Sequence, residues 1–254
     1  MASQVITRRS TAASRNLAEQ LQPLVRVHES IRVRTKVSLD VPRGRTRVRA
    51  GRPAFDAADV LSTTGDLTKS FYRTAASFEH SGLATTPQLT ALRERSLDPA
   101  RLALAWCNGE SLPRDTTMRL ARSVAAVIGN AVLSHAATAL ADGFSFSSWK
   151  RPQCPCCGAS PDLAVITDTR RSLVCWRCDS TWRTDLAGCI GCGADLAPDV
   201  VRIASPHLGY QVAICNACGR YIKERRGAPP QPLLVERMLT LGLDEAAQQR
   251  GLRA

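Results

Sequence analysis

The C-terminal half of this chain reads Cys154-Pro-Cys-Cys157, Cys175-Trp-Arg-Cys178, Cys189-Ile-Gly-Cys192 and Cys215-Asn-Ala-Cys218. A tetrahedral metal ion with metal–sulfur distances of about 2.3 Å needs two thiolates from one tight turn, and a Cys-x-x-Cys turn supplies them. Glycine follows the second cysteine of three pairs, at 158, 193 and 219, and suits such turns because it tolerates positive φ. The pattern therefore predicts that these eight cysteines bind two metal ions.

The spacing of the pairs predicts how they share the two ions. Between Cys157 and Cys175 lie 17 residues, and between Cys192 and Cys215 lie 22. Zinc ribbons typically have about 15–20 residues at this point. We therefore expect sequential pairing, with Cys154, Cys157, Cys175 and Cys178 in site 1 and Cys189, Cys192, Cys215 and Cys218 in site 2. An interleaved arrangement is the alternative.

A structural role for the ions is the favoured interpretation. Disulfides require an oxidising compartment, and the sequence shows no targeting signal for one. Thioredoxin-like enzymes use one Cys-x-x-Cys at a strand-to-helix junction, unlike four spaced pairs. Four thiolate ligands also leave no coordination position for a hydrolytic water. Since no nucleophile elbow, phosphate loop or paired-carboxylate motif stands out, we expect the chain not to be an enzyme.

Two further cysteines are interpreted as bystanders. Cys156 lies inside the first pair, where its side chain is expected to point away from the ion. Cys107 lies in the apolar segment 102–107 and is expected to be a buried helical thiol.

The positive charge of the chain is concentrated at its N-terminus. Residues 1–53 contain 12 Lys/Arg and 3 Asp/Glu, which accounts for +9 of the formal net charge of +12. Eight thiolates carry more negative charge than two divalent ions neutralise. Metal binding therefore lowers the net charge of the cysteine region to about neutral. A neutral region attracts phosphates weakly, so nucleic-acid binding is not the expected function.

The pattern of apolar residues along the sequence predicts an α+β protein with a helical part followed by short strands. Apolar residues recur at three and four spacing between residues 54 and 141, and the longest helix is expected to begin near Asp115. Strands are expected at 163–167, 171–175, 199–204 and 210–215. The predicted domains are a basic and flexible arm (1–53), a helical domain (54–148), a first metal module (149–186), a second metal module (187–228) and a C-terminal helix and tail (229–254).

Segments that would direct the chain to a membrane are not evident. The first 30 residues lack an apolar run, and no stretch reaches the roughly 18 apolar residues of a bilayer span. We therefore expect a cytoplasmic protein. The oligomeric state is not predictable from these features.

The sequence around the cysteines is more specific than the general zinc-ribbon pattern. It reads Cys154-Pro-Cys-Cys-Gly-Ala-Ser-Pro161, Leu173-Val-Cys-Trp-Arg-Cys-Asp-Ser-Thr-Trp182, Cys189-Ile-Gly-Cys-Gly193 and Cys215-Asn-Ala-Cys-Gly-Arg-Tyr-Ile-Lys223. In these motifs and their order, the chain resembles the FdhE-type accessory proteins of formate dehydrogenase from about Ala131 onward. It departs from the family pattern at Leu186, where an arginine is usual, and it is short for the group.

The resemblance implies a helical domain followed by two rubredoxin-like modules in a cytoplasmic protein. It also implies a partner, the catalytic subunit of formate dehydrogenase, whose maturation or activity the protein would support. Zinc or iron suits both sites, because four sulfurs in a tetrahedron accept either metal. Two alternatives stay open: a nucleic-acid-binding zinc-ribbon protein that uses the basic arm, and a rubredoxin-like electron carrier.

Overall fold

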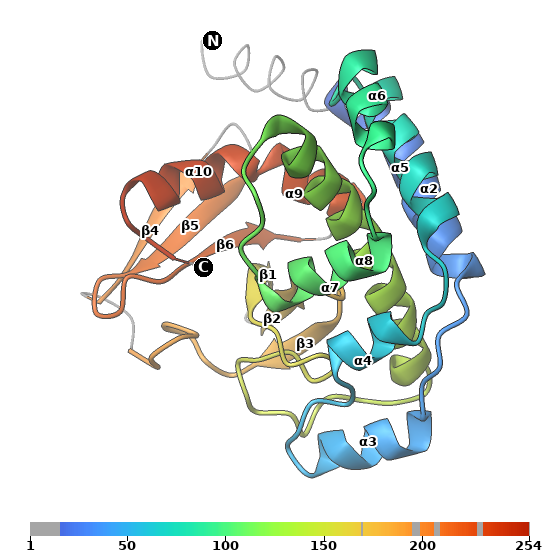
Figure 1. The fold of residues 1–254 in the computed structure, drawn as a ribbon. Coiled ribbons are helices and arrows are strands. Elements are labelled where there is room, and N and C mark those ends of the chain that lie inside the picture. The colour runs from blue at the N-terminus through green and yellow to red at the C-terminus, as the bar shows by residue number, and fades with distance from the viewer. Residues whose placement is uncertain (1–15, 169, 195–198, 206–208, 228–230, 254) are drawn as a thin grey trace. The chain divides into compact units, whose positions relative to one another are not determined.

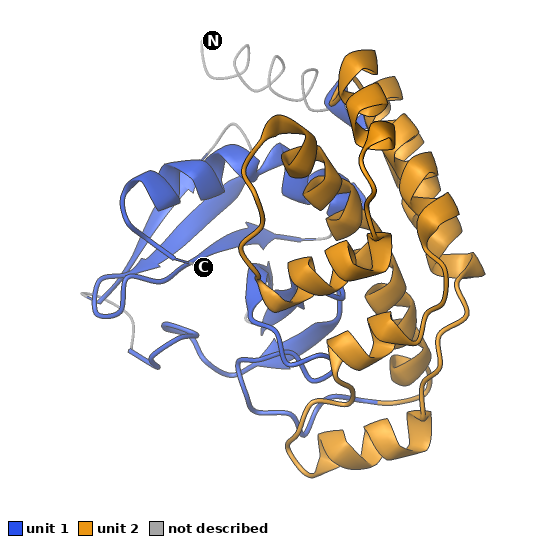
Figure 2. Ribbon diagram, in the orientation of Figure 1, with its two compact units in different colours: residues 1–18, 145–254 blue, residues 19–144 orange. Residues whose placement is uncertain are grey.

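The computed structural model describes residues 16–168, 170–194, 199–205, 209–227 and 231–253. The chain divides into two compact units, a helical unit of Glu19–Phe144 and a sheet unit that contains Ser145–Ala254 (Figure 2). The α+β class is confirmed, with helices, a cysteine-bearing sheet and helices again at the C-terminus. The division between the units lies four residues before the predicted start of the first metal module at residue 149.

Seven α-helices of the helical unit lie wholly within the described residues (Figure 1). They are α2 (Gln22–Arg34), α3 (Val41–Arg49), α4 (Ala57–Ser62), α5 (Thr68–His80), α6 (Thr86–Glu94), α7 (Pro99–Asn108) and α8 (Thr116–Ala141). Capping side chains define several starts: Asp115 accepts a hydrogen bond from the backbone N–H of Met118, and Asp98 does the same for Ala100. These caps confirm that the long helix begins where the sequence predicts.

The core of this unit forms around α8, which packs against α2, α4, α5, α6 and α7. Val124, Ala125, Val132, Leu133 and Leu140 on α8 are fully buried. By length and mean hydropathy α8 could also cross a membrane, which corrects the expectation that no stretch is long enough. However, 72% of its most apolar window is buried, as in the core helix of a soluble protein, so the finding is weak evidence for a span.

The prediction that residues 1–53 form a flexible arm is wrong for α2 and α3, which are helices. Leu21, Leu24, Val25 and Ile31 recur at helical spacing and are buried, because α2 packs on α5 and α8. Burial of these apolar side chains thus orders α2, although the charge pattern of the segment indicates flexibility. Residues 1–15 lie outside the described part of the chain.

The sheet unit is one continuous six-stranded sheet in the order β3-β2-β1-β6-β5-β4. Its strands are β1 (Pro161–Thr167), β2 (Arg170–Cys175), β3 (Thr181–Thr184), β4 (Val200–Ser205), β5 (Tyr210–Cys215) and β6 (Tyr221–Arg226). The first three strands belong to one cysteine module and the last three to the other. All pairs inside a module are antiparallel, whereas β1 and β6 join the modules in parallel, with Leu163 opposite Lys223.

The parallel junction places both cysteine clusters at one end of the sheet. β1 begins four residues after Cys157 and β6 begins three residues after Cys218, and both strands run away from their cysteines in the same direction. The hairpin between β1 and β2 therefore lies at the opposite end, about 20 Å away for strands of this length.

Two helices follow the sheet, where the sequence predicts one. They are α9 (Leu233–Leu239) and α10 (Leu241–Gln249), and Thr240 separates them. Leu243 and Ala247 of α10 pack with Val212 of β5 and Tyr221 of β6, which covers one face of the second module.

Candidate metal centres

The structure gathers the eight predicted cysteines into two clusters in the sequential arrangement. In site 1 the Sγ atoms of Cys154 and Cys178 are 3.5 Å apart, as are those of Cys157 and Cys175. In site 2 the corresponding pairs, Cys189 with Cys218 and Cys192 with Cys215, are both 3.6 Å apart. Within each cluster all four sulfurs lie within 4.8 Å of one another.

These distances fit a tetrahedral ion and exclude disulfides between these atoms. Metal–sulfur bonds of about 2.3 Å separate the sulfurs of a regular tetrahedron by about 3.8 Å, whereas bonded sulfurs are about 2.05 Å apart. Each cluster is therefore able to hold one metal ion, and four sulfur donors suit zinc or iron. The two clusters fit two such ions per chain.

All four Cys-x-x-Cys turns share one backbone hydrogen-bond pattern. The N–H of the first cysteine donates to the carbonyl five residues later, as from Cys154 to Ala159 at 2.8 Å. The carbonyl of that cysteine accepts from the N–H four residues later, as from Gly158 at 3.0 Å. Three turns also direct an N–H at the sulfur of the first cysteine, donated by Cys156, Arg177 and Gly191. The backbone hydrogen bonds thus give all four turns the same conformation.

The residue after the second cysteine has positive φ in every turn. Glycine provides it in three turns, at 158, 193 and 219, as the sequence predicts. In the second turn Asp179 adopts a φ of 58°, a conformation that costs a side-chain-bearing residue about 1 kcal/mol. An aspartate at this position therefore indicates a compensating contact.

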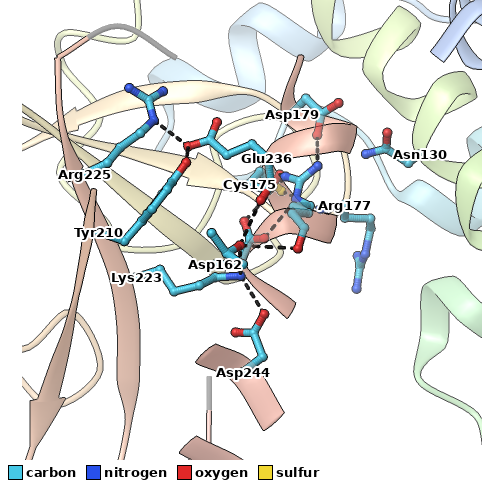
Figure 3. Close-up of polar contacts among 12 residues, drawn as sticks. Asn130, Asp162, Cys175, Arg177, Asp179, Tyr210, Lys223, Arg225, Glu236 and Asp244 are labelled. Carbon is cyan, nitrogen blue, oxygen red and sulfur yellow. Dashed lines mark hydrogen bonds and ion pairs between the residues drawn. The ribbon is translucent and has the colours of Figure 1, made fainter. Parts of the chain in front are cut away.

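Arg237 of α9 provides that contact. Its guanidinium donates to Asp179 Oδ1 at 2.5 Å, to Asp162 Oδ2 at 2.8 Å and to the carbonyl of Cys175 at 2.8 Å. Figure 3 shows Asp162, Asp179 and Cys175 gathered around this interaction. Burial opposes the charge of Arg237, but Asp162 and Asp179 together outweigh it and raise the pKa of Arg237, so the guanidinium stays charged. The C-terminal helix is thereby tied to site 1.

The C-terminal segment also reaches site 2. The backbone of Arg253 pairs with Gly219 and Tyr221, and its guanidinium donates to the carbonyl of Cys218 at 3.2 Å. Sequence reasoning missed both Arg237 and Arg253, because their partners lie 32–75 residues away along the chain. One segment therefore contacts the cysteine turns of both clusters.

Buried polar contacts hold this segment on the sheet (Figure 3). Glu236 accepts hydrogen bonds from Arg225 at 2.5 Å and from the Tyr210 hydroxyl at 2.6 Å. Lys223 donates to Asp244 at 2.6 Å. These partners come from β5 and β6 on one side and from α9 and α10 on the other, so the position of the helices is specified by charge as well as by apolar packing.

The two clusters differ in exposure. All four cysteines of site 1 are buried, whereas in site 2 Cys192 is exposed and Cys218 is partly exposed. Water and chelators can therefore approach a sulfur of site 2 but not of site 1.

Each cluster has a thiol that ionises easily. Burial opposes ionisation of Cys178, but hydrogen bonds from neighbouring cysteine thiols outweigh it and lower its pKa well below that of a free thiol. Burial likewise opposes ionisation of Cys189, where the backbone N–H groups of Cys192 and Gly191 prevail and lower the pKa to about 7. Thiolates are the form that binds metal. Burial raises the pKa of Cys154 and Cys175 in site 1 and of Cys215 and Cys218 in site 2, so the thiols of each cluster differ in their tendency to ionise.

Cys156 lies beside site 1, which corrects the expectation that it points away. Its thiol is buried and interacts with the thiols of Cys154 and Cys178. It is not one of the four sulfurs that surround the cluster centre. Cys107 is buried on α7, as expected.

Comparison with known proteins finds relatives that share one name, FdhE homolog. No family model matches the sequence. The chain is 27% identical over 111 residues to an FdhE homolog of Shewanella baltica, which covers 41% of this chain and 37% of that protein. It is 30% identical over 117 residues to an FdhE homolog of Aquifex aeolicus, covering 42% and 41% respectively. The matched part thus spans about two fifths of these curated relatives.

A solved structure resembles nearly the whole chain. The crystal structure of the FdhE protein from Pseudomonas aeruginosa superposes with a TM-score of 0.68, covers 97% of this chain and 92% of that one, and is 19% identical. At this identity the likeness shows the fold.

Proposed function

Because sequence matches and fold both support the FdhE family, we propose that this chain is a formate dehydrogenase accessory protein. In the proposed role it binds the catalytic subunit of formate dehydrogenase in the cytoplasm, supports the maturation or activity of that subunit and has no catalytic activity of its own. The observation that carries the proposal is the ordered set of four cysteine turns, folded as two four-sulfur clusters in a chain of this fold.

The metal ions have a structural part in this proposal. The ligands are Cys154, Cys157, Cys175 and Cys178 for one ion and Cys189, Cys192, Cys215 and Cys218 for the other. Each ion fixes two turns at the same end of the sheet, and the C-terminal segment contacts both clusters through Arg237 and Arg253. The partner would therefore meet a rigid surface whose shape depends on metal occupancy.

Co-purification tests this function. Tagged protein is expected to retain the catalytic subunit of formate dehydrogenase, and Cys154→Ser with Cys157→Ser is expected to abolish retention. Cys107→Ala is the matched control, because this buried cysteine belongs to the helical unit and to neither cluster. An unchanged yield of active dehydrogenase in a strain that lacks the protein would refute the proposal.

The nucleic-acid alternative finds little support in the basic segment. Arg45 donates to the carbonyls of Leu140 and Asp142, and Arg47 donates to that of Pro53. The guanidinium groups of Arg45 and Arg49 also lie over the Phe144 ring. These side chains are engaged within the helical unit, which leaves fewer of them for phosphates.

The exposure of Cys192 is the observation that favours the alternative of an electron carrier. An exposed sulfur shortens the path for an electron to a redox partner. A reversible one-electron couple in iron-loaded protein, lost in Cys192→Ser, would support this function over the accessory role.

A further inference from the structure

A pocket of about 400 Å³, lined mostly by charged residues, lies on the sheet unit around the β1–β2 hairpin end. The hairpin lies at the end of the sheet opposite both cysteine clusters, whereas the lining residue Ala187 is two residues before Cys189. Four arginines line it: Arg170 and Arg171 of β2, Arg202 of β4 and Arg226 of β6. Its volume lies in the range of about 300–1,000 Å³ that is usual for small-molecule sites.

Glu224 is the buried carboxylate of the pocket and is 1% exposed. One of its oxygens accepts from Arg171 at 2.7 Å, and the other accepts from Arg202 at 2.9 Å and from Gln211 at 2.8 Å. One carboxylate thus faces two guanidinium groups, which leaves one positive charge uncompensated. The buried Nε–H of Arg171 has no hydrogen-bond acceptor among the described residues.

Part of this network has a structural explanation. Arg171 also donates to the carbonyls of Leu186 and Gly188, and Arg202 donates to that of Ala187. These bonds hold the linker between the two modules against the sheet. They account for Arg171 and Arg202 but not for the other two arginines.

Arg170 and Arg226 are exposed and lie on the strands that flank β1 on either side. Within the described ranges the guanidinium group of neither residue makes a hydrogen bond or ion pair, although both backbones are paired in strands. With Asp168 as the further acid in the lining, four guanidinium groups face two carboxylates, a net charge of +2. The pocket therefore has both charge and donors left for a ligand.

We propose that this pocket binds a small phosphate-bearing polyanion. Guanidinium groups match phosphate oxygens in pairs of hydrogen bonds, and partial enclosure strengthens each of them. Among the described residues no aromatic side chain lines the pocket, so the recognised part of the ligand is the anionic group and not a stacked base. The inference is independent of the accessory function.

Titration calorimetry with pyrophosphate tests this inference on the full-length, zinc-loaded protein at low ionic strength. We expect saturable binding with one site per chain. The double variant Arg170→Gln/Arg226→Gln is expected to weaken it at least tenfold, because both exposed donors are lost. Unchanged circular dichroism and melting temperature would show that this loss does not come from unfolding.

Arg183→Gln is the matched control, because Arg183 is an exposed arginine of β3 that does not line the pocket. Its affinity for pyrophosphate is expected to equal that of the parent. Equal weakening in this control, or undiminished binding in the double variant, would indicate an adventitious ion only and overturn the proposal. Citrate that binds as tightly as pyrophosphate, with the same loss in the double variant, would overturn the assignment to phosphate in favour of carboxylates.

Discussion

The guanidinium of Arg237 lies 2.5 Å from the carboxylate of Asp179, the residue that directly follows the last cysteine of site 1. This ion pair joins a helix near the C-terminus to a turn 58 residues earlier in the chain. A metal-binding turn with an unfavourable backbone conformation thus depends on a side chain outside both cysteine modules.

Removal of Arg237 is expected to loosen site 1. Arg237→Gln leaves the mostly buried carboxylates of Asp162 and Asp179 without their cation, which costs about 3 kcal/mol. The melting temperature should fall, and site 1 should release its ion to a chelator faster. Arg250→Gln, at the exposed end of α10, is the control and should change neither quantity. Equal melting temperatures for the two variants would contradict the proposed link.

Substitutions of Asp179 should separate backbone strain from the ion pair. Asp179→Gly and Asp179→Ala both remove the contact with Arg237, but only glycine adopts the φ of 58° without strain. The alanine variant is therefore expected to be less stable than the glycine variant by about 1 kcal/mol. Urea unfolding of both variants gives this difference, and a more stable alanine variant would show that the turn adopts another conformation in solution.

Metal stoichiometry should report the pairing of the cysteines. Two zinc or iron ions per chain are expected by elemental analysis, and Cys154→Ser should reduce this to one. Cys156→Ser and Cys107→Ala should retain two, because neither sulfur belongs to a cluster. Loss of both ions from Cys154→Ser, with the chain still folded, would contradict independent sites.

The ion in site 2 should leave before the ion in site 1. Cys192 is exposed, whereas every cysteine of site 1 is buried. Chelator-driven release is therefore expected in two phases, and Cys189→Ser should remove the faster one. A single phase in the parent protein, or loss of the slower phase in Cys189→Ser, would refute this order.

Stability at high pH should depend on Tyr221. Burial and the hydrogen bond to Asp244 raise the pKa of Tyr221 to about 12, from an unfolded value near 10. Because the folded state favours the neutral phenol, this contribution is complete below about pH 10 and is lost as the pH rises through about 12. Tyr221→Phe should therefore lose less melting temperature between pH 9 and 11 than the parent does. Tyr72→Phe in the helical unit is the control, and an identical decline in Tyr221→Phe and the parent would exclude the effect.

Local patterns predicted the cysteine clusters and most of the strands. A Cys-x-x-Cys turn encodes its own geometry, and the predicted strands at 163–167 and 171–175 fall within β1 and β2. The sequence pattern does not predict the helix α2, although its apolar residues recur at helical spacing, because the basic residues between them favour a flexible arm. There the apolar period was the better guide.

Contacts between distant parts of the chain were beyond local patterns. Nothing near Arg237 indicates that its partners are Asp162 and Asp179, and nothing near Arg171 indicates Glu224. These pairs depend on how the strands order themselves in the sheet. A short stretch of sequence shows which residue types are available for such pairs. It does not show which residue pairs with which.

The parallel pairing of β1 with β6 has a consequence during synthesis of the protein. Of the six strands in this sheet, β1 leaves the ribosome first, and β6, which covers one of its edges, leaves last. Until translation passes Arg226, the backbone N–H and C=O groups along that edge of β1 stay open to pairing with another chain. A nascent or truncated chain that ends before Tyr221 is thus the form most prone to aggregation, and completion of the last strand is the step that protects the first.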